Sequence, residues 1–326
     1  MDFNIKPTIN STDNYNILCA TDNNYVPYCG IMLTSLFENN KNLKLHVFIL
    51  TENLNEENQN NLKRVAKLYD QHLDIIFVNN EAISNCPIRK GDHVSIATYY
   101  RLLAPELLPS NIDKVLYLDC DMIINSDISN LCNVDIDGYP IAMSLDEAFF
   151  EDEKYQRLNY DKKYPYRNAG VALFNIRHWR EHNLVEKCFE YISNNPEKVI
   201  FHDQDTLNAL LHHRIKSLPI KYNLQTGFLF NAYKEHYRDE IDNIMEAATS
   251  PIIIHYTGPG KPWFKGSRHP FVKRYLYYKN ISIWSSTPLL KVKYSLKDKI
   301  HKLVTTLIWK LGVKKMPKTY IIDKQA

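Results

Sequence analysis

Two carboxylates close the apolar stretch KVLYLDCDMII, residues 114–124, where burial alone does not require charge. In an extended chain, residues two apart point to the same side, so Asp119 and Asp121 can project together while Cys120 turns aside. Two unpaired like charges repel, and a divalent cation that also contacts a phosphate would relieve that repulsion. A helix or turn cap beside a solvated aspartate is the structural alternative, because a bare DxD is common by chance.

His255 ends the apolar run IIIH and precedes the loop sequence YTGPGKPW. The ordinary role of such a histidine is to lie buried with a hydrogen bond to a carbonyl group. As a third metal ligand, it would stand beside glycines that let a phosphate approach and a lysine that neutralises the phosphate. Two carboxylates and one imidazole suit Mn²⁺ better than Mg²⁺, which prefers oxygen ligands and is kept here as the alternative ion.

Two more polar stretches have side chains that can bind a sugar. HDQD, residues 202–205, begins a predicted helix, where acidic residues either cap the first turn or bind hydroxyl groups and stabilise a positively charged reaction centre. YRNAG, residues 166–170, is either a turn, with Gly170 supplying an unusual backbone angle, or a place where Asn168 binds a hydroxyl group.

Strands and helices alternate along the part of the chain that would position these residues. Apolar runs predict strands at 16–21, 43–50, 73–80, 114–124, 139–145, the start of 166–181 and the start of 251–263. Helical spacing predicts helices at 28–40, 51–69 with a threonine cap, 95–109, the end of 166–181, and 201–213. This order predicts a mostly parallel sheet with helices on both faces and ligands at the carboxyl ends of its strands.

The composition narrows the class of protein. The 326 residues are 44% hydrophobic, enough for one large domain or two smaller ones. A net charge of +3, from 40 basic and 37 acidic residues, argues against a protein that coats nucleic acid. The six cysteines contain no CxxC pair, which indicates reduced and mostly buried thiols. A polar N-terminal stretch and the lack of an apolar run of membrane-spanning length predict a cytoplasmic protein.

A basic segment follows from about residue 284. Its sequence KVKYSLKDKIHKLVTTLIWKLGVKK contains many lysines and a single acidic residue, Asp298. Apolar residues at helical spacing predict an appended amphipathic helix: Leu296, Ile300, Leu303, Leu307 and Leu311. Such a helix either packs on the protein's own domain or lies on a membrane, with its lysines at anionic headgroups and Trp309 in the interface.

Six stretches together resemble one known family. They are ATDNNY, SIATYYRL, KVLYLDCDMII, YRNAGVALFN, HDQDTLNALL and HYTGPGKPW, within residues 15–265. Their order and approximate spacing are similar to those of the retaining glycosyltransferases of family eight, which include bacterial lipooligosaccharide galactosyl- and glucosyltransferases and the glycogenins. The resemblance implies a GT-A fold, a UDP-sugar donor, Mn²⁺ and retention of the donor's anomeric configuration. It divides the chain into a catalytic domain, residues 1–275, and a basic tail, residues 276–326.

The resemblance also implies roles for particular residues. The positions that match the family's uridine site are Ala20, Asp22, Asn24 and Tyr25. The metal ligands would be Asp119, Asp121 and His255, and the diphosphate would contact Gly258 and Lys261. Arg101 would reach the diphosphate and sugar, and the sugar-binding positions match Asn168, Asp203 and Gln204. Gln204 and Asp203 are the candidate catalytic residues. Because an amide is a poor nucleophile, attack on the same face as the leaving phosphate is favoured over a covalent intermediate.

The activity that follows is transfer of galactose or glucose from its UDP-sugar to a glycan acceptor. The basic tail favours a lipopolysaccharide or lipooligosaccharide acceptor and an enzyme bound to the inner face of the cell membrane. A transferase that acts on a protein, or a UDP-sugar-binding protein without transfer activity, is the alternative. The stretch 146–165, where the acceptor would be recognised, contains no motif that the resemblance explains.

Overall fold

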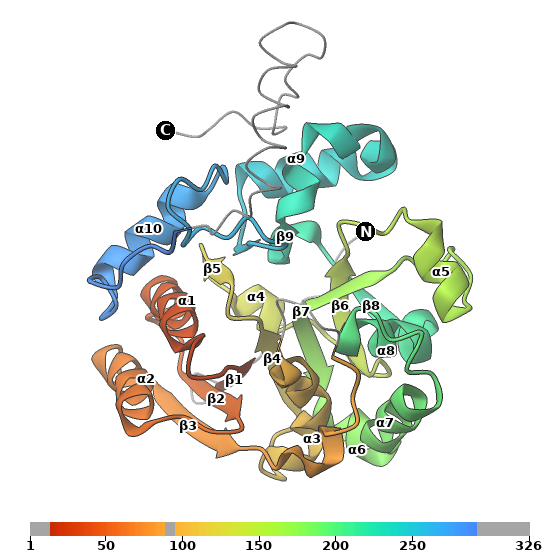
Figure 1. The fold of residues 1–326 in the computed structure, drawn as a ribbon, viewed down its shortest axis with the longest axis horizontal. Coiled ribbons are helices and arrows are strands. Elements are labelled where there is room, and N and C mark those ends of the chain that lie inside the picture. Colours follow the sequence, from red (N-terminus) through yellow and green to blue (C-terminus); the bar gives the residue numbers. More distant parts are fainter. Residues whose placement is uncertain (1–13, 89–94, 292–326) are drawn as a thin grey trace, which may run out of the picture.

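A seven-stranded sheet forms the centre of the computed structural model, which describes residues 14–88 and 95–291 (Figure 1). The strands follow the spatial order β3-β2-β1-β4-β7-β6-β8. Their bounds are β1 (Tyr15–Ala20), β2 (Leu45–Thr51), β3 (His72–Phe77), β4 (Lys114–Leu118), β6 (Ile141–Leu145), β7 (Arg167–Asn175) and β8 (Ile215–Leu218).

Six of these strands run in one direction. Strand β1 is parallel to β2 and β4, β2 is parallel to β3, and β6 is parallel to β8. Strand β7 is antiparallel to both of its neighbours, β4 and β6. The start of β7 therefore lies at the same edge of the sheet as the carboxyl ends of the other strands. The prediction of a mostly parallel, mixed sheet is confirmed.

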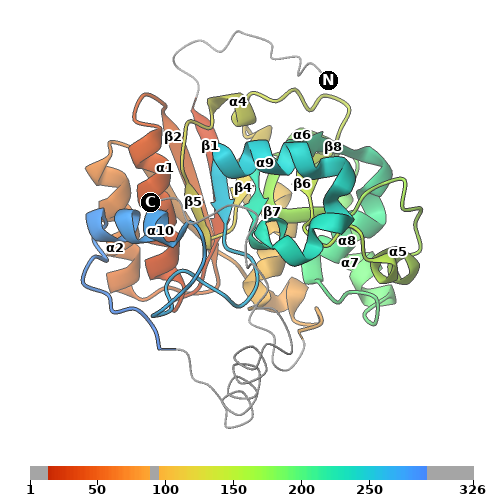
Figure 2. The ribbon, with the colours of Figure 1, turned by 90° about the horizontal axis from the view of Figure 1, so that it is seen from above.

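Helices cover both faces of the sheet (Figure 2). On one face, Ile17 and Cys19 of β1 pack with buried residues of α1 and α2. On the other, Leu18 packs with buried residues of η2 (Ile96–Leu103), α6, α7 and α8. The α-helices are α1 (Val26–Asn39), α2 (Glu56–Leu68), α3 (Ala104–Leu107), α4 (Ser129–Cys132), α5 (Asp152–Leu158), α6 (Ile176–Glu181), α7 (Leu184–Asn194), α8 (His202–Leu211), α9 (Ile241–Thr249) and α10 (Val272–Ile281). Successive residues of β1 thus point to opposite faces, and both faces are buried under helices.

A second, three-stranded sheet lies beside the first and was not predicted. Its order is β5 (Met122–Ile124), β10 (Ile253–His255) and β9 (Leu224–Gln225). The single strand predicted over 114–124 is therefore two strands in different sheets, with Asp119 to Asp121 as the link. Apolar content cannot reveal this break, because apolar, buried residues of β4 and β5 stand on both sides of it.

Two local predictions differ from the structure. Helix α2 begins after Asn55, whose side-chain oxygen accepts a hydrogen bond from the backbone N–H of Asn58, whereas Thr51 completes β2. The predicted threonine cap is therefore wrong. The helix predicted over 95–109 is a 3₁₀-helix, η2 (Ile96–Leu103), that continues into α3. The remaining 3₁₀ turns are η1 (Asn80–Ile83), η3 (His212–Arg214), η4 (Ile220–Tyr222), η5 (Thr226–Leu229) and η6 (Asn231–Glu240).

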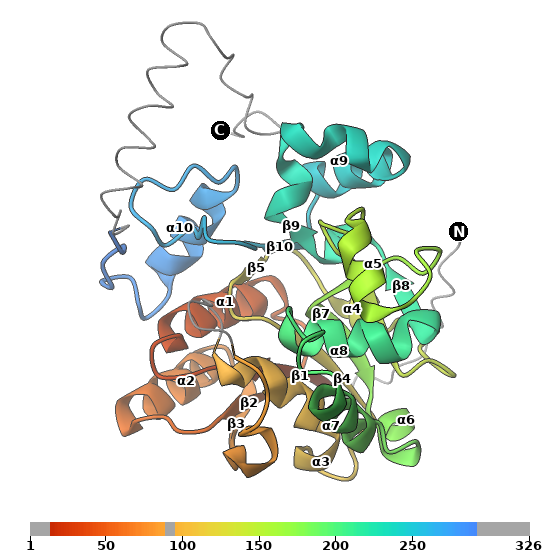
Figure 3. The same ribbon diagram turned by 45° about the vertical axis from the view of Figure 1, so that its right-hand side comes forward.

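The segment after β10 returns to the first helix of the chain. Helix α10 lies beside α1 (Figure 3), and Tyr278 and Trp284 belong to the same buried cluster as α1. Residues 276–291 thus pack against α1, and the division at residue 275 stays a prediction. The helix predicted around Leu296 to Leu311 lies outside the described residues. Within the described part of the chain, no helix has the length and apolarity needed to cross a bilayer.

Candidate functional site

Asp119 and Asp121 lie in the link between β4 and β5, at the edge where the parallel strands end. The backbone N–H of Asp119 donates to the carbonyl of Gly170 over 2.9 Å, and the N–H of Tyr256 donates to the carbonyl of Asp121 over 3.0 Å. Cys120 turns away, as predicted, and its thiol donates to the carbonyl of Ala20 over 3.2 Å. Backbone contacts from two sheets thus fix the direction of both carboxylates.

His255, the last residue of β10, completes a cluster with the two aspartates. Its Nε2 lies 3.2 Å from Asp121 Oδ1 and 3.8 Å from Asp119 Oδ2. One ligand atom from each of the three side chains lies within 4.8 Å of the other two. The structure therefore brings together the three residues that the sequence indicated as metal ligands.

The hydrogen-bond network behind His255 determines which ring nitrogen carries the proton. The backbone N–H of Gly170 lies 3.0 Å from the side chain of Asn168, so the atom that faces it must be the oxygen Oδ1. The same oxygen accepts from Nδ2 of Asn223 over 2.8 Å, which leaves Oδ1 of Asn223 to face His255 Nδ1 at 2.9 Å. Nδ1 therefore carries the hydrogen, and the lone pair of Nε2 points at the aspartates, as a metal-ligating histidine requires.

Gly170 is needed at this site because of its size. It lies within β7, and its φ is not positive. A Cβ atom there would lie 2.4 Å from Cε1 of His255 and 2.7 Å from Oδ2 of Asp119. The alternative in which this stretch is a turn and Gly170 supplies an unusual backbone angle is therefore wrong. The residue lets a strand pass directly behind Asp119 and His255.

Lys261 adds a positive charge to the cluster. Its Nζ donates to Asp121 Oδ2 over 2.5 Å and to the carbonyl of Tyr256 over 2.7 Å. Burial opposes ionisation of Asp121, but the ammonium group of Lys261 outweighs it and holds the pKa of this carboxyl well below its usual range. Asp121 is therefore a carboxylate at every physiological pH.

Arg101, expected to reach a diphosphate and sugar, is buried and fully engaged. Its guanidinium donates to Asp119 Oδ1 over 2.9 Å and to the carbonyl of Ala169 over 2.7 Å, and its Nε lies 2.9 Å from Asp203 Oδ2. Thr98 donates to the other oxygen of Asp203. Burial raises the pKa of Asp203, and Arg101 counters part of that rise. In this structure Arg101 and Asp203 position Asp119, and their direct contact with a donor stays a prediction.

Gln204 belongs to a second group of polar side chains, next to the cluster of Asp119, Asp121 and His255. Its Oε1 accepts from the N–H of Ala169 over 3.0 Å, and its Nε2 donates to Asp146 Oδ2 over 3.2 Å. The same oxygen of Asp146 accepts from Asn168 Nδ2 over 3.1 Å, and Lys154 Nζ lies 3.4 Å from Oδ1. Asp146 therefore links Asn168 and Gln204, two of the three residues that the sequence assigned to sugar binding.

Asp146 and Asn223 were missed by the sequence analysis. Asp146 directly follows the predicted strand 139–145, and the carboxyl end of that strand was a usable signal for a ligand site. Asn223 lies between η4 and β9, and no pattern distinguishes it from a loop asparagine. Both are buried, at 5% and 0% exposure, and buried polar side chains need partners such as those found here.

The predicted uridine residues lie at the end of β1 and in the turn that follows it, next to the end of β2. Asp22 and Asn24 line a pocket there together with Thr51 and Tyr100. Oδ1 of Asp22 accepts from the backbone N–H of Asn24 over 2.8 Å, which fixes the turn that leads into α1. Tyr25, the next residue, packs edge-on against Tyr28 and Trp263.

Not every acidic residue of HDQD faces the site. Asp205 is fully buried and binds Arg157 through both oxygens, at 2.7 Å and 3.2 Å. It also accepts from the hydroxyl of Tyr166 over 2.6 Å. Asp205 therefore holds α8 in place, which is the structural alternative for this motif, while Asp203 and Gln204 face the other way. Helix α8, which contains all three residues, begins at His202, whose φ of 53° is rare for a residue with a side chain.

A model of one protein family matches most of the chain. The family is described as Glycosyl transferase family 8, and the match covers residues 16–266. General stress protein A of Bacillus subtilis is 26% identical over 83% of this chain and 94% of its own length. A lipopolysaccharide 1,2-glucosyltransferase of Escherichia coli is 28% identical over 91% of this chain and 87% of its own length.

The fold has a clear match among solved structures. The galactosyltransferase LgtC, crystallised with donor and acceptor sugar analogs, superposes with a TM-score of 0.74 at 25% identity. The superposition covers 82% of this chain and 96% of that protein. The predicted fold class, a GT-A-like fold with a mixed sheet and helices on both faces, is confirmed.

Proposed function

The chain belongs to glycosyl transferase family 8, and we propose that it is a retaining hexosyltransferase, which moves galactose or glucose from a UDP-sugar to a glycan acceptor with the help of Mn²⁺. Family membership and fold make it a glycosyltransferase. The donor, the ion and the acceptor are our proposal. The observation that carries it is the convergence of Asp119, Asp121 and His255 at the edge where the parallel strands end.

The donor set of this cluster fits a divalent transition ion. Asp119 and Asp121 offer oxygen atoms, and His255 offers an Nε2 lone pair whose direction Asn223 fixes. A mixed set of oxygen and nitrogen supports Mn²⁺ over Mg²⁺. When bound, the ion would neutralise negative charge that develops on the diphosphate as the bond to the sugar breaks.

The loop after β10 would bind the diphosphate of the donor. Lys261 is already held beside Asp121 by its hydrogen bonds and would add a positive charge for the departing UDP. Gly258 has a φ of 70°, which a residue with a side chain rarely adopts, and the space beside its Cα is open. These two features support the predicted roles of Gly258 and Lys261.

The base and the sugar would lie on opposite sides of the metal cluster. We assign the uridine to the ends of β1 and β2, where Asp22 and Asn24 line the pocket and Ala20 and Tyr25 adjoin it. We assign the sugar to the side of the cluster where Gln204 lies, with Asp146 as an additional contact. Asn168 and Asp203 would support this sugar site from the protein interior.

Attack on the same face as the departing phosphate explains retention best. The amide oxygen of Gln204 already accepts a hydrogen bond from Ala169, and an amide is a weak nucleophile. In the proposal Gln204 instead orients the sugar and stabilises positive charge at the anomeric carbon. Asp203, deep behind Arg101, acts by holding that arginine against Asp119.

The acceptor that we propose is a glycan of lipopolysaccharide or lipooligosaccharide. One relative is named as a lipopolysaccharide glucosyltransferase, and the basic segment beyond residue 291 would hold the enzyme on the inner face of the membrane. A protein acceptor is the alternative with the same fold, and UDP-sugar binding without transfer is the alternative of another class.

The experiment for the donor site measures UDP release by slow hydrolysis. Purified protein is incubated with Mn²⁺ and a panel of UDP-sugars without acceptor. Two variants are measured in the same way: His255→Ala, and the control His213→Ala, which changes an exposed histidine. We expect release from UDP-galactose or UDP-glucose in the control and the unchanged chain, and loss of it with a chelator or in His255→Ala. Equal release in both variants would contradict the assignment of the metal site.

The acceptor is tested with the donor that this experiment selects. Radiolabelled UDP-hexose is offered with truncated lipopolysaccharide and, separately, with a total protein extract from which lipid has been removed. Label in the lipid-linked glycan supports the proposed acceptor, and label confined to protein overturns it in favour of the protein transferase. UDP binding without label in either fraction overturns transfer to both kinds of acceptor.

A further inference from the structure

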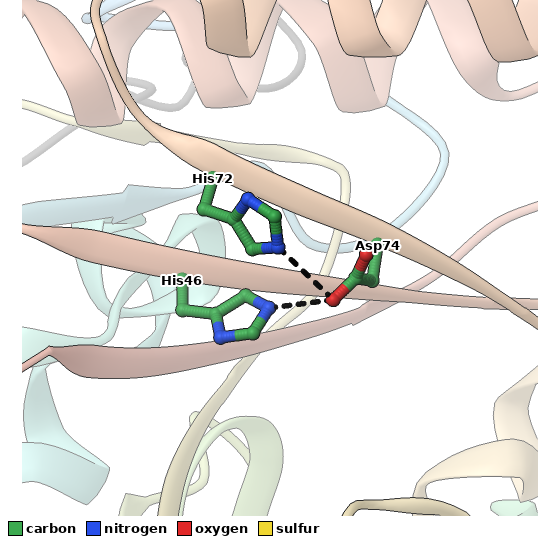
Figure 4. Close-up of side chains that lie close together, drawn as sticks. All are labelled: His46, His72 and Asp74. Atoms are coloured by element: carbon green, nitrogen blue, oxygen red, sulfur yellow. Dashed lines mark hydrogen bonds and ion pairs between the residues drawn. The ribbon is translucent and has the colours of Figure 1, made fainter.

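A second group of metal-ligating side chains lies on strands β2 and β3 (Figure 4). His46 of β2 and His72 of β3 both direct Nε2 at the same oxygen, Asp74 Oδ2, over 2.7 Å and 3.3 Å. Among the described residues, two groups of three histidine, cysteine or acidic side chains bring ligand atoms within 4.8 Å of one another, and this is the group outside the site above.

The register of the two strands creates this group. His46 and His72 are Cα partners in the parallel pairing of β2 with β3. Asp74 follows His72 by two residues and therefore points to the same face of the sheet. The two imidazole rings contact each other with their centres 4.3 Å apart, and Phe48 packs on the His46 ring at 4.1 Å. Two adjacent strands thus present three ligands on one face.

The three ligand atoms lie close enough together to share one zinc ion. Zinc–nitrogen bonds of about 2.0 to 2.1 Å place neighbouring ligand atoms of a tetrahedron about 3.3 Å apart. The distance from His72 Nε2 to Asp74 Oδ2, 3.3 Å, equals this value. The distance from His46 Nε2 to the same oxygen, 2.7 Å, would have to lengthen by about 0.6 Å on zinc binding. The ligand atoms of the two histidines lie within 4.8 Å of each other. Two imidazoles and one carboxylate suit Zn²⁺, whereas Mg²⁺ and Ca²⁺ prefer oxygen ligands.

We propose that His46, His72 and Asp74 bind one Zn²⁺ ion, with water in the fourth position. The side chain of His46 is 18% exposed and anchored by Phe48, while those of His72 and Asp74 are 65% and 49% exposed, so the ion can enter from solvent. The bound ion ties β3, at the end of the strand order, to its neighbour β2. It therefore stabilises an edge strand.

This site is separate from the glycosyltransferase site. His46 precedes Thr51, which lines the pocket at the carboxyl end of β2, by five residues or about 16 Å of extended strand. Loss of the zinc site should leave catalysis intact, and a failure of the zinc proposal would not affect the proposed function.

The test is the zinc stoichiometry of the full-length chain, measured by calorimetry with ZnCl₂ in a buffer without chelator. The variants are His72→Gln, which removes an exposed ligand, Asp74→Asn, which keeps the shape of the side chain, and His213→Gln as the matched control. Folding of each variant is checked by circular dichroism, and UDP release is measured alongside.

We expect His72→Gln and Asp74→Asn each to bind one Zn²⁺ fewer per chain than the unchanged protein and His213→Gln. Zinc should also raise the melting temperature of the unchanged protein more than that of His72→Gln. Equal zinc binding in all four proteins would overturn the proposal. So would a loss of zinc in Asp74→Asn that is accompanied by an equal loss of UDP release, because the two sites would then be one.

Discussion

At the scale of single residues, the proposed metal site depends on neighbours that supply no ligand atom. Gly170 leaves space behind the ligands, Asn223 fixes the histidine tautomer, and Arg101 holds Asp119 from the buried side. Each of these contacts fixes a direction. Changing one of them should therefore weaken ion binding before it unfolds the chain.

Gly170→Ala should abolish Mn²⁺-dependent UDP binding, because the new methyl group would overlap His255 and Asp119. Calorimetry with UDP, with and without Mn²⁺, measures the effect. Gly138→Ala is the control: its φ of 77° makes alanine strained, yet nothing lies within 4 Å of the new methyl group. The control should lose about 1 kcal/mol of stability and keep Mn²⁺-dependent binding. Unchanged Mn²⁺ dependence in Gly170→Ala would refute this account of the glycine.

Asn223→Ala should weaken Mn²⁺ binding by about 10- to 100-fold, which is typical when the partner of a ligating histidine is removed. Asn223→Asp keeps an oxygen that accepts from His255 Nδ1 and should retain more of the affinity than alanine does. Titration of Mn²⁺ at fixed UDP measures both variants. Equal affinity of the alanine and aspartate variants would mean that the hydrogen bond to Nδ1 has no part in ion binding.

His269 makes a prediction about acid stability. Burial, with Lys261 nearby, lowers its pKa to about 3 from an ordinary 6.5. As the pH falls below 6.5, His269 takes up a proton in the unfolded chain before it does so in the folded one. The free energy of unfolding should therefore fall by about 1.4 kcal/mol for each unit by which the pH drops between 6.5 and about 3.

The variant His269→Asn tests this dependence, because asparagine can accept from the N–H of Phe271 as the Nδ1 atom does. Denaturant unfolding at a series of pH values should give a shallower acid limb for the variant. Parallel curves for the two proteins would show that His269 is not the group that titrates.

At the scale of elements, the alternation of strands and helices could be predicted from the sequence, but which strands pair with each other could not. Every strand predicted in the main sheet exists, because each combines apolar residues with a clear boundary. The break at Asp119 was invisible, since β4 and β5 are alike in composition and differ only in the sheet that they join. Pairing across sheets depends on contacts far apart in the sequence.

The residues of the site followed the same rule. Asp119, Asp121 and His255 were predicted because each stands at the end of an apolar run, where charge is unexpected. Asn223 and the close packing at Gly170 could not be predicted, because their role arises from contact with residues 55 and 85 positions away. The burial of Arg101 was also missed, because an arginine on a helix is usually exposed and its partners Asp119 and Asp203 are distant in the sequence.

At the scale of the whole molecule, the boundary of the folded domain can be tested by truncation. Residues 276–291 place Trp284 against α1, where a Cβ on Gly30 would meet its ring at 1.9 Å. A chain that ends at 291 should therefore melt at the temperature of the full-length protein. A chain that ends at 275 should be less stable by about 3 kcal/mol or more, as when a buried tryptophan is removed.

The two truncated chains also test the membrane proposal. Sedimentation with anionic vesicles should recover the full-length protein and neither truncated chain, because we attribute membrane binding to the lysines beyond residue 291. Vesicle binding by the chain that ends at 291 would place that function in the catalytic domain. Equal stability of both truncated chains would support a domain boundary at 275.

The most direct test of the central claim is the Mn²⁺ dependence of UDP binding in the unchanged protein and in Asp121→Asn. The account predicts tight binding with Mn²⁺ and weak binding without it for the unchanged protein. It predicts weak binding under both conditions for Asp121→Asn, whereas the surface control Asp137→Asn should behave like the unchanged protein. If Asp121→Asn still bound UDP more tightly with Mn²⁺, to the same extent as the unchanged chain, the cluster of Asp119, Asp121 and His255 would not be the metal site.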